Sequence, residues 1–586
     1  MDTLGTMVSP VDALTPKVQA ALRAALGEQY AEVDPVIRPS QYADLQVNVA
    51  LALAKQVGMP PRALATAVVE HLDLAEMASS VEVSGPGFIN VTLSPEWISA
   101  AVSSVAADSR LGIPQVDPDV IPIDYSAPNV AKEMHVGHLR TTVVGDALAR
   151  TLERLGHTVI RQNHVGDWGT NFGMLVEYLM EVGEDSAQAQ LIETDPNTFY
   201  QNARNRFEAS EEWANRARAR VVSLQAGDAE TLRVWRGMVE HSKRYFTRVY
   251  TTLGVTLTDA DLAGESTYND QLADICAELE AKGIATVSDG ALCVFLDGYT
   301  GREGKPVPLI VRKSDGGYGY ATTDLATVRY RVATLHADRI LYVVGAPQSL
   351  HFHMVWAAAR LAGWLPDSVT TTHVQIGNVL GPDKRLLRTR EGAALKLMSL
   401  LQEGIDKARA YVDQARPELP DAERAAIAWQ VGIGAIKYAD LSVAHDSEYV
   451  FDLDRMLALT GNTGPYLQYA TTRVRSIFRS VGEDPDAPVW RATPIVVADP
   501  TERALALLLL GYGSVVSEVG AAYEPHRLCG YLFEVASAFS AFYEACPVLK
   551  AETDDVKASR MALSALTLRV LVEGLSLLGV ESPVQM

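Results

Sequence analysis

Two histidines with a glycine between them are the residues of this sequence best suited to chemistry. His135 and His138 flank Val136 and Gly137 at the start of a predicted helix. A helix N-terminus offers free N–H groups and a positive dipole to phosphates. The histidines can donate hydrogen bonds to phosphate oxygens as charge develops on them, and Gly137 lets a flat base approach the backbone. The alternative is a polar helix start with two incidental histidines.

The elements around these histidines favour the nucleotide interpretation. An apolar strand is predicted over residues 120–125, a helix over 139–155 and a second strand over 158–160. Strand, helix and strand in this order form a parallel pair with a right-handed crossover. Open α/β sheets bind ligands at the carboxyl ends of their strands, which is where the two histidines then lie.

The rest of the chain divides into segments of different character. A small α+β module is predicted at the N-terminus, and a Pro- and Asp-rich linker follows it. In the module, a helical pattern begins at Leu45. The other predicted segments are strands at 81–83 and 88–93, the linker at 113–119, a polar helical insertion over 180–260, strands at 291–296, 307–311 and 340–344, a helix at 350–362, and helices alone from about residue 395.

Composition and charge exclude several classes of protein. The chain has 586 residues, of which 48% are apolar, so it is not a low-complexity disordered protein. It carries 51 Lys and Arg against 72 Asp and Glu, a net charge of −21. This argues against a sequence-independent DNA binder but allows a local basic patch for another nucleic acid.

Cysteine usage and hydropathy point to an intracellular protein. The four cysteines are not spaced for a zinc site or a disulfide framework. No signal peptide is evident, and the longest apolar run, 504–510, is far shorter than the ~20 residues of a membrane span. We therefore expect a soluble, cytoplasmic protein without a membrane or DNA partner.

Five blocks of sequence together resemble a known enzyme family. They are Ser126–Arg140, which contains His135-Val-Gly-His138, then Asn163-His-Val-Gly-Asp-Trp-Gly169, Tyr320-Ala-Thr-Thr-Asp324, Gly461–Ala470, and a terminal helix with a short tail ending at Met586. The first block resembles the signature of class I aminoacyl-tRNA synthetases. The set is similar to arginyl-tRNA synthetases along the whole chain.

The resemblance implies an α/β fold of three parts. It implies a small α+β add-on domain at 1–115 that binds the tRNA elbow. A Rossmann-type parallel-sheet catalytic domain is expected at 116–395, with an insertion at about 180–290. A C-terminal α-helical bundle at 396–586 is expected to bind the anticodon.

The resemblance also implies ATP-dependent ligation of L-arginine to tRNA(Arg) through an arginyl-adenylate. ATP would act as its Mg²⁺ complex, with no zinc, no other metal and no bound organic cofactor, and we expect a monomer. Tyr320 and Asp324 are spaced to share one helix face, where a carboxylate could meet a guanidinium fork. The alternatives are a core aromatic and a helix N-terminal acid. By resemblance, the arginine site comprises Asp124, Ser126, Asn129, His138, Tyr320, Asp324 and Gln348, and the ATP site comprises Lys132, His135, Gly137, His138, His351 and Arg388.

The second class I signature departs from the family pattern in this chain. Thr389 stands where a phosphate-binding lysine is expected, although Lys384 and Arg388 are nearby. Many arginyl-tRNA synthetases similarly lack this lysine and have a lysine just ahead of the first signature, at the position that Lys132 occupies in this chain. The catalytic set that we expect is therefore His135, Gly137, His138, Lys132 and Arg388. A solvated basic loop is the alternative for Lys384 and Arg388.

Binding of tRNA by so acidic a chain requires its positive charge to be segregated. Arginine-rich stretches occur at 204–206, 216–220 and 473–479. Aromatic and arginine side chains stack on the splayed bases of RNA loops. By resemblance, Tyr466, Arg473 and Tyr543 contact the anticodon loop, and Phe88 and Asn90 contact the elbow. Packing within the helical bundle is the alternative for each tyrosine, Tyr469 above all.

Three other interpretations are weaker. A cysteinyl class I enzyme would need zinc-binding cysteines near the active site. A non-catalytic relative that binds tRNA or senses arginine would have lost the histidines or the pocket acids. A general nucleotidyltransferase with the same histidine motif would not need the helical C-terminal part.

Overall fold

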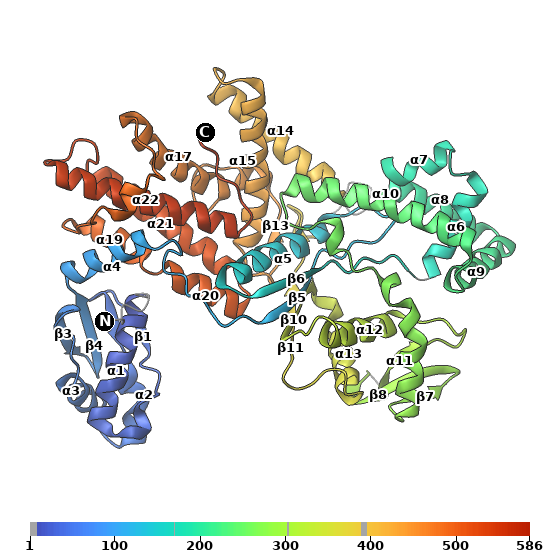
Figure 1. The fold of residues 1–586 in the computed structure, drawn as a ribbon, viewed down its shortest axis with the longest axis horizontal. Helices are drawn as coiled ribbons and strands as arrows, with labels where there is room; N and C mark the ends of the chain where they lie inside the picture. Colours follow the sequence, from blue (N-terminus) through green and yellow to red (C-terminus); the bar gives the residue numbers. More distant parts are fainter. Residues whose placement is uncertain (1–8, 169, 302–303, 388–394) are drawn as a thin grey trace.

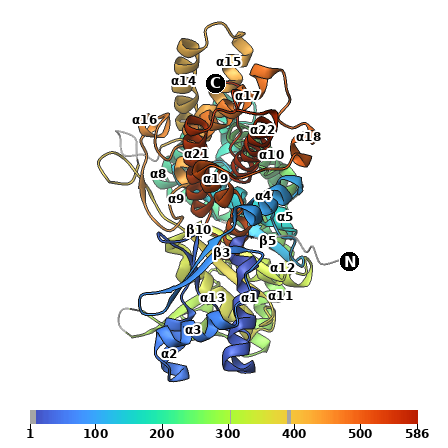
Figure 2. The same ribbon diagram turned by 90° about the vertical axis from the view of Figure 1, so that its left-hand side faces the viewer.

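The computed structural model describes residues 9–168, 170–301, 304–387 and 395–586. The N-terminal module is a four-stranded antiparallel sheet in the order β1-β2-β4-β3 with helices packed on it (Figures 1 and 2). The helix predicted from Leu45 is wrong at its start, because Leu45–Val47 pairs as a strand. The elements of the N-terminal module are α1 (Pro10–Leu26), η1 (Glu28–Tyr30), β1 (Ile37–Pro39), β2 (Leu45–Val47), α2 (Val49–Val57), α3 (Pro61–Glu70), β3 (Ala78–Ser84), β4 (Phe88–Leu93) and α4 (Pro95–Ala107).

A parallel sheet of four strands lies at the centre of the molecule. Its order is β11-β10-β5-β6, and the predicted strand–helix–strand unit is its β5–α5–β6 part. Strand β10 separates two cores: Leu341 and Val343 face the core that contains α5, and Ile340 and Tyr342 face the core of α12 and α13. The elements are β5 (Val120–Asp124), α5 (Val136–Leu155), β6 (Thr158–Gln162), α12 (Tyr320–Ala333), β10 (Arg339–Gly345), η4 (Ala346–Gln348), α13 (Ser349–Leu361) and β11 (Thr370–Ile376).

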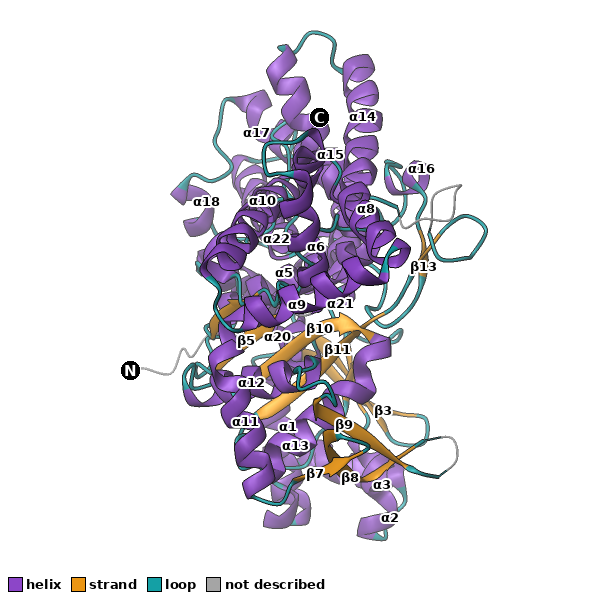
Figure 3. Cartoon of the chain, turned by 90° about the vertical axis from the view of Figure 1, so that its right-hand side faces the viewer, coloured by secondary structure: helices purple, strands orange, loops and turns teal. Residues whose placement is uncertain are grey.

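Two insertions separate β6 from α12. The first is helical, as predicted, and its longest helix is α10. The second carries the strands predicted at 291–296 and 307–311, which form an antiparallel sheet, β7-β8-β9, apart from the parallel one (Figure 3). The elements are α6 (Thr170–Val182), α7 (Ala187–Thr194), α8 (Pro196–Ala209), α9 (Glu211–Gln225), α10 (Ala229–Leu253), η2 (Asp259–Asp261), η3 (Glu265–Tyr268), α11 (Asn269–Ala281), β7 (Ala285–Ser288), β8 (Ala291–Thr300) and β9 (Pro306–Arg312).

The C-terminal part is a helical bundle, with one exception to the prediction of helices alone. The short strand β13 pairs with β12, which lies before the bundle. Residues Pro500–Ala522 are apolar and long enough for a membrane span by composition alone, but they form two helices and are half buried. The elements are β12 (Val379–Leu380), α14 (Leu397–Ala415), α15 (Asp421–Leu441), β13 (Tyr449–Val450), α16 (Leu453–Met456), α17 (Gly464–Val481), α18 (Pro488–Ala492), α19 (Pro500–Leu509), α20 (Tyr512–Ala522), α21 (His526–Ala545) and α22 (Asp554–Leu577).

The bundle packs directly on the helix that begins at the two histidines. Arg140 of α5 forms a fully buried ion pair with Asp440 of α15, at 3.2 Å. Further along α5, the buried Asp146 lies beside Lys437 of α15, whose ammonium donates to the carbonyl of Leu253 at the end of α10. Helix α5 therefore connects the sheet, the helical insertion and the bundle. At the other end of the bundle, α4 packs against α18, α19 and α22 and attaches the N-terminal module (Figure 1).

Candidate functional site

The two histidines close the N-terminus of α5 by accepting backbone hydrogen bonds. His135 is the N-cap, and its Nδ1 accepts the N–H of Gly137 at 3.0 Å. Nδ1 of His138 accepts the N–H of His135 at 3.1 Å, and the two ring centroids are 4.1 Å apart. Because both Nδ1 atoms accept, each neutral ring carries its proton on Nε2. Both rings are therefore set to donate through Nε2.

Both histidines are neutral donors at physiological pH. Burial, and to a lesser degree His135, lowers the pKa of His138 to about 3. Burial and the neighbouring Lys132 lower the pKa of His135. Gly137 is needed here for a steric reason beyond an open approach, because a Cβ at this position would lie 2.7 Å from Cε1 of His135.

A cavity of about 710 Å³ opens in front of these residues, and we call it the signature cavity. It lies at the carboxyl ends of β10 and β11, where an open parallel sheet is expected to bind a ligand. Most of its wall is apolar or backbone. Its lining includes Ser126, Ala127, His135, Gly137, His138, Thr141, Val344, Gly345, Gln348, Gly377 and Asn378.

A second cavity, of about 400 Å³, adjoins the first, and we call it the acidic pocket. Ala127, Val344 and Gln348 line both cavities, so the two meet along this wall. The pocket brings together six residues of the predicted arginine and ATP sites. They are Asp124, Asn129, Tyr320, Asp324, Gln348 and His351.

Asp324 bonds one histidine of the pocket and lies near a second. His351 Nε2 lies 2.6 Å from its Oδ2, and His164 Nε2 lies 3.9 Å from its Oδ1. Tyr320, one helical turn earlier on α12, is 69% exposed and lies at the rim. The spacing of Tyr320 and Asp324 therefore places both on the pocket, as expected. His351 was expected beside the nucleotide, but its ring contacts the acid.

Asp124 is paired beneath the pocket with a residue that the sequence did not indicate. The fully buried Arg331 donates to Oδ2 of Asp124 at 2.8 Å. The other oxygen, Oδ1, is buried without a hydrogen-bond partner. The negative charge of Asp124 is thus compensated by Arg331, and the second carboxylate oxygen, Oδ1, remains able to accept a hydrogen bond.

Glu265 is a further pocket residue that sequence reasoning missed. Burial, followed by the nearby Asp324 and Asp167, raises its pKa to about 8. An isolated acid after a loop, far along the chain from Tyr320, gave no local signal. Together with Asp324 and Asp124 it makes the pocket acidic, which suits a ligand with two cationic groups.

Three extended segments form the wall that carries several of these side chains. The backbone of Asn163–Val165 pairs with 261–265, and Gly166 pairs with 128–130, all in parallel. Successive side chains of an extended segment point to opposite sides. Accordingly His164 faces the acidic pocket, whereas Val165 and Asp167 line a separate cavity behind it. At the start of η3, Glu265 lines the acidic pocket and Ser266 lines the cavity behind it.

The remaining predicted ligands are placed differently. Ser126 lines the signature cavity, and its hydroxyl lies 2.8 Å from that of Tyr250. Lys132 extends toward the insertion, where its Nζ lies 4.4 Å from the centroid of the Tyr200 ring. Arg388 and Thr389 lie outside the described residues. Lys384 is described and has a left-handed backbone, with φ of 59°.

The residues expected to contact tRNA lie on two parts of the surface. Arg473 stacks on the ring of Tyr543, with its Cζ 4.6 Å from the ring centroid, and Tyr466 packs against Phe533. Tyr469, for which packing was the alternative, is 44% exposed. Phe88 is partly exposed on β4, whereas the amide of Asn90 is largely buried and bonds Gln46 and Ser84.

The arginine-rich stretches of the insertion are neutralised locally, which the sequence did not predict. Arg204, Arg206 and Arg220 pair with glutamates of their own or neighbouring helices. Arg475 and Arg479 bond carbonyls of the C-terminal tail.

Among the described residues, no group of three or more His, Cys, Asp or Glu is arranged to hold a metal ion.

Three family models match the chain in order. The arginyl tRNA synthetase N terminal domain matches residues 12–93, and the class I (R) tRNA synthetase catalytic domain matches 101–453. The DALR anticodon binding domain matches 467–586.

Whole proteins show the same similarity. The arginine–tRNA ligase of Thermobifida fusca is 65% identical over 99% of this chain and 100% of its own length. That of Frankia casuarinae is 51% identical over all of both chains. Among solved structures, arginyl-tRNA synthetase from Plasmodium falciparum has a TM-score of 0.82 at 25% identity, covering 99% of this chain and 100% of its own. The Thermus thermophilus structure has a TM-score of 0.80 at 26% identity, covering 98% and 100%.

Proposed function

This chain belongs to the class I arginyl-tRNA synthetases and ligates L-arginine to tRNA at the expense of ATP, and we propose that the two joined cavities divide this reaction between them. Arginine occupies the acidic pocket, and ATP, as its Mg²⁺ complex, occupies the signature cavity. The observation that carries the proposal is the shared wall at Ala127, Val344 and Gln348.

Arginine fits the acidic pocket in one direction. A guanidinium presents a planar fork of donors, for which Asp324 and Glu265 offer carboxylates and Tyr320 a flat rim. The α-ammonium is then held by the free Oδ1 of Asp124 and by Asn129. In this direction the arginine carboxylate points along Gln348 to the signature cavity, where the α-phosphate of ATP lies.

The chemistry in the signature cavity is positioning and charge stabilisation. A carboxylate oxygen of arginine attacks the α-phosphorus, the bond to the bridging oxygen breaks, and pyrophosphate leaves. The Nε2–H groups of His135 and His138 donate to the phosphate oxygens that gain charge. Neutral donors give this stabilisation without a counter-charge that would hold pyrophosphate. In the second step, a terminal tRNA hydroxyl attacks the carbonyl carbon of the adenylate and AMP leaves.

Binding of tRNA(Arg) is assigned to the two ends of the chain. The bundle at 396–586 is proposed to bind the anticodon, with Tyr466, Arg473 and Tyr543 as contacts. The module at 1–115 is proposed to bind the elbow, with the partly exposed Phe88 and the largely buried Asn90 as its residues there. We propose that the enzyme acts as a cytoplasmic monomer.

The decisive experiment is charging of tRNA across the twenty amino acids, followed by competition with L-citrulline. Citrulline has the shape of arginine, but a neutral urea replaces the guanidinium. We expect charging with arginine alone and no inhibition by citrulline at concentrations where arginine saturates. Asp324→Asn should raise the KM for arginine and leave the KM for ATP unchanged. Inhibition by citrulline at those same concentrations would contradict recognition of charge by the acidic pocket.

A further inference from the structure

The loop between β5 and α5 is held in an unfavourable backbone conformation. Ser126, Ala127 and Ala131 have φ angles of 73°, 48° and 58°, in the left-handed region that residues with a Cβ rarely adopt. This loop, residues 126–135, carries Asn129 to the acidic pocket and His135 to the signature cavity. Such backbone persists only where surrounding contacts over-determine it. Those contacts therefore determine the positions of Asn129 and His135 in the two cavities.

One face of α10 supplies three of these contacts, and Asn163, Gly166 and Asn197 supply others. Ser242 Oγ accepts the N–H of Ala131 at 2.9 Å, and the hydroxyl of Tyr245 accepts the N–H of Met134 at 3.1 Å. One and a half turns later, the hydroxyl of Tyr250 bonds Ser126. Ser242, Tyr245 and the two residues that they bond are each at most 5% exposed. Water cannot replace these acceptors, so the loop depends on them.

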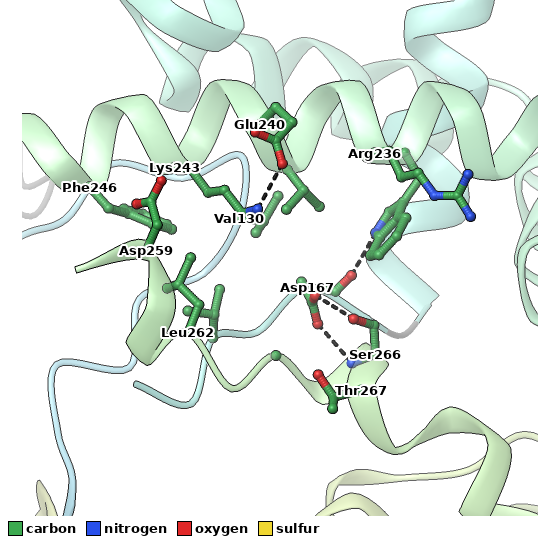
Figure 4. Close-up of a pocket in the computed structure, with 14 residues that line it drawn as sticks. Val130, Asp167, Arg236, Glu240, Lys243, Phe246, Asp259, Leu262, Ser266 and Thr267 are labelled. Carbon is green, nitrogen blue, oxygen red and sulfur yellow. Dashed lines mark hydrogen bonds and ion pairs between the residues drawn. The ribbon is translucent and has the colours of Figure 1, made fainter. Parts of the chain in front are cut away.

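The same helix face also reaches the second segment of the wall. Trp235 Nε1 donates to the carbonyl of Asp167 at 2.8 Å, and the carboxylate of Asp167 accepts the N–H and hydroxyl of Ser266, next to Glu265. Figure 4 shows Asp167 turned toward Ser266, across a cavity of about 300 Å³ from Glu240, Lys243 and Phe246 of α10. This cavity thus lies between the wall and the side of α10 that carries Arg236, Glu240 and Lys243. On the side of α10, the loop is held at Ala131 and Met134 by the individual hydrogen bonds of Ser242 and Tyr245.

We propose that Ser242 and Tyr245 are positioning residues for arginine activation. They hold the part of loop 126–135 around the left-handed Ala131 and so help to set the places of Asn129, Lys132 and His135, without touching arginine or ATP. This inference rests on the proposed function, because the loop matters for catalysis only if the two cavities bind arginine and ATP.

The test combines Ser242→Ala and Tyr245→Phe with a backbone suppressor, Ala131→Gly. Glycine adopts a positive φ without steric cost, so it should maintain the loop when the Ser242 acceptor is lost. We expect each single α10 variant to lower kcat by about tenfold or more, since small misplacements of reacting groups are that costly. Hydrogen–deuterium exchange of peptides spanning 126–136 should rise in both. Ser242→Ala combined with Ala131→Gly should recover most of the lost kcat, whereas Ala131→Gly alone should stay close to wild type.

Controls separate positioning from general damage and from a wrong function. Thr252→Ala removes an α10 hydroxyl that bonds only within its helix and should leave kcat and loop exchange unchanged. Ser242→Thr keeps the acceptor and should retain activity. If Ser242→Ala does not fold, Tyr245→Phe, which keeps the ring, carries the test. Wild-type kcat in both variants, or a lower kcat without faster loop exchange, would overturn the proposal. A wild-type chain that fails to charge arginine would instead contradict the proposed function, while the exchange data still test the hydrogen bonds.

Discussion

At the scale of single residues, the acids of the pocket differ in what burial does to them. Asp124 is compensated by Arg331, whereas burial and the nearby Asp324 and Asp167 raise the pKa of Glu265 to about 8. An empty pocket therefore holds Glu265 protonated at neutral pH. A guanidinium that enters favours the carboxylate, so binding of arginine should release a proton.

This linkage predicts that arginine binds more tightly as pH rises. The ordinary pKa of a glutamate is near 4.5 and the raised value is about 8, so affinity should increase within this window and level off above it. The increase is at most about tenfold per pH unit for one proton. Calorimetry in two buffers of different ionisation enthalpy measures the released proton directly. Glu265→Gln should remove both the pH dependence and the released proton, and a release that persists in this variant would assign it to another group.

Lys132 is the second residue with a specific prediction. Its ammonium now lies over Tyr200, on the insertion side, and a flexible lysine stem can swing from there toward the phosphates near His135. We expect Lys132→Ala to lower kcat by about tenfold or more, with a smaller effect on the KM for arginine.

Lys384→Ala is the matched comparison and should have the weaker effect. A double variant of Lys132 and Arg388 shows by non-additivity whether the two share one phosphate site. A kinetically silent Lys132→Ala would mean that this lysine does not replace the cation missing at Thr389.

At the scale of elements, α5 joins catalysis to the bundle through buried charge. Removal of one partner from a buried ion pair leaves the other uncompensated, at a cost of about 3–5 kcal/mol. Asp440→Ala should therefore destabilise the protein strongly, since Arg140 beside it is 1% exposed as a side chain. Arg140→Met combined with Asp440→Leu should be less destabilised than Asp440→Ala alone.

Urea unfolding of these variants provides the measurement. Arg204→Ala serves as the control, because its pair with Glu208 is exposed on both sides. Exposed pairs contribute about 0–1 kcal/mol. If Asp440→Ala and Arg204→Ala shifted the midpoint equally, the buried pair would not be an anchor of α5.

At the scale of the whole molecule, the catalytic half depends on the bundle. Loss of residues after about 400 would expose Arg140 and Asp146 of α5 and remove Glu573, the partner of Arg154. It would also uncover the apolar face that α5 shares with α20 and α22. We expect such a fragment to be poorly soluble and unable to bind tRNA. Sedimentation of the expressed fragment and tRNA binding by filter retention test this, and a soluble fragment that binds tRNA would contradict it.

The distribution of charge also belongs to this scale. The arginines of the helical insertion are paired with glutamates, so they do not form the basic surface that their spacing indicated. The stacked pair of Arg473 and Tyr543, on α17 and α21, presents both an aromatic ring and a cation at the surface.

The sequence by itself determined the features that depend on local spacing. The histidine pair at the mouth of α5, the β5–α5–β6 unit and the shared helix face of Tyr320 and Asp324 follow from residues a few positions apart. The backbone of such short segments is largely fixed by their own side chains and hydrogen-bond pattern, so these segments can be predicted from local spacing.

Only the tertiary structure decided which distant residues complete the site. Glu265 enters the pocket because its segment pairs with Val165, and Arg331 compensates Asp124 from a helix more than two hundred positions away. Ser242 and Tyr245 give no sign in the sequence that their hydroxyls bond the loop at Ala131 and Met134. These contacts arise when separate elements pack on one core. Their energy depends on burial and on hydrogen bonds across the chain, which local spacing does not encode.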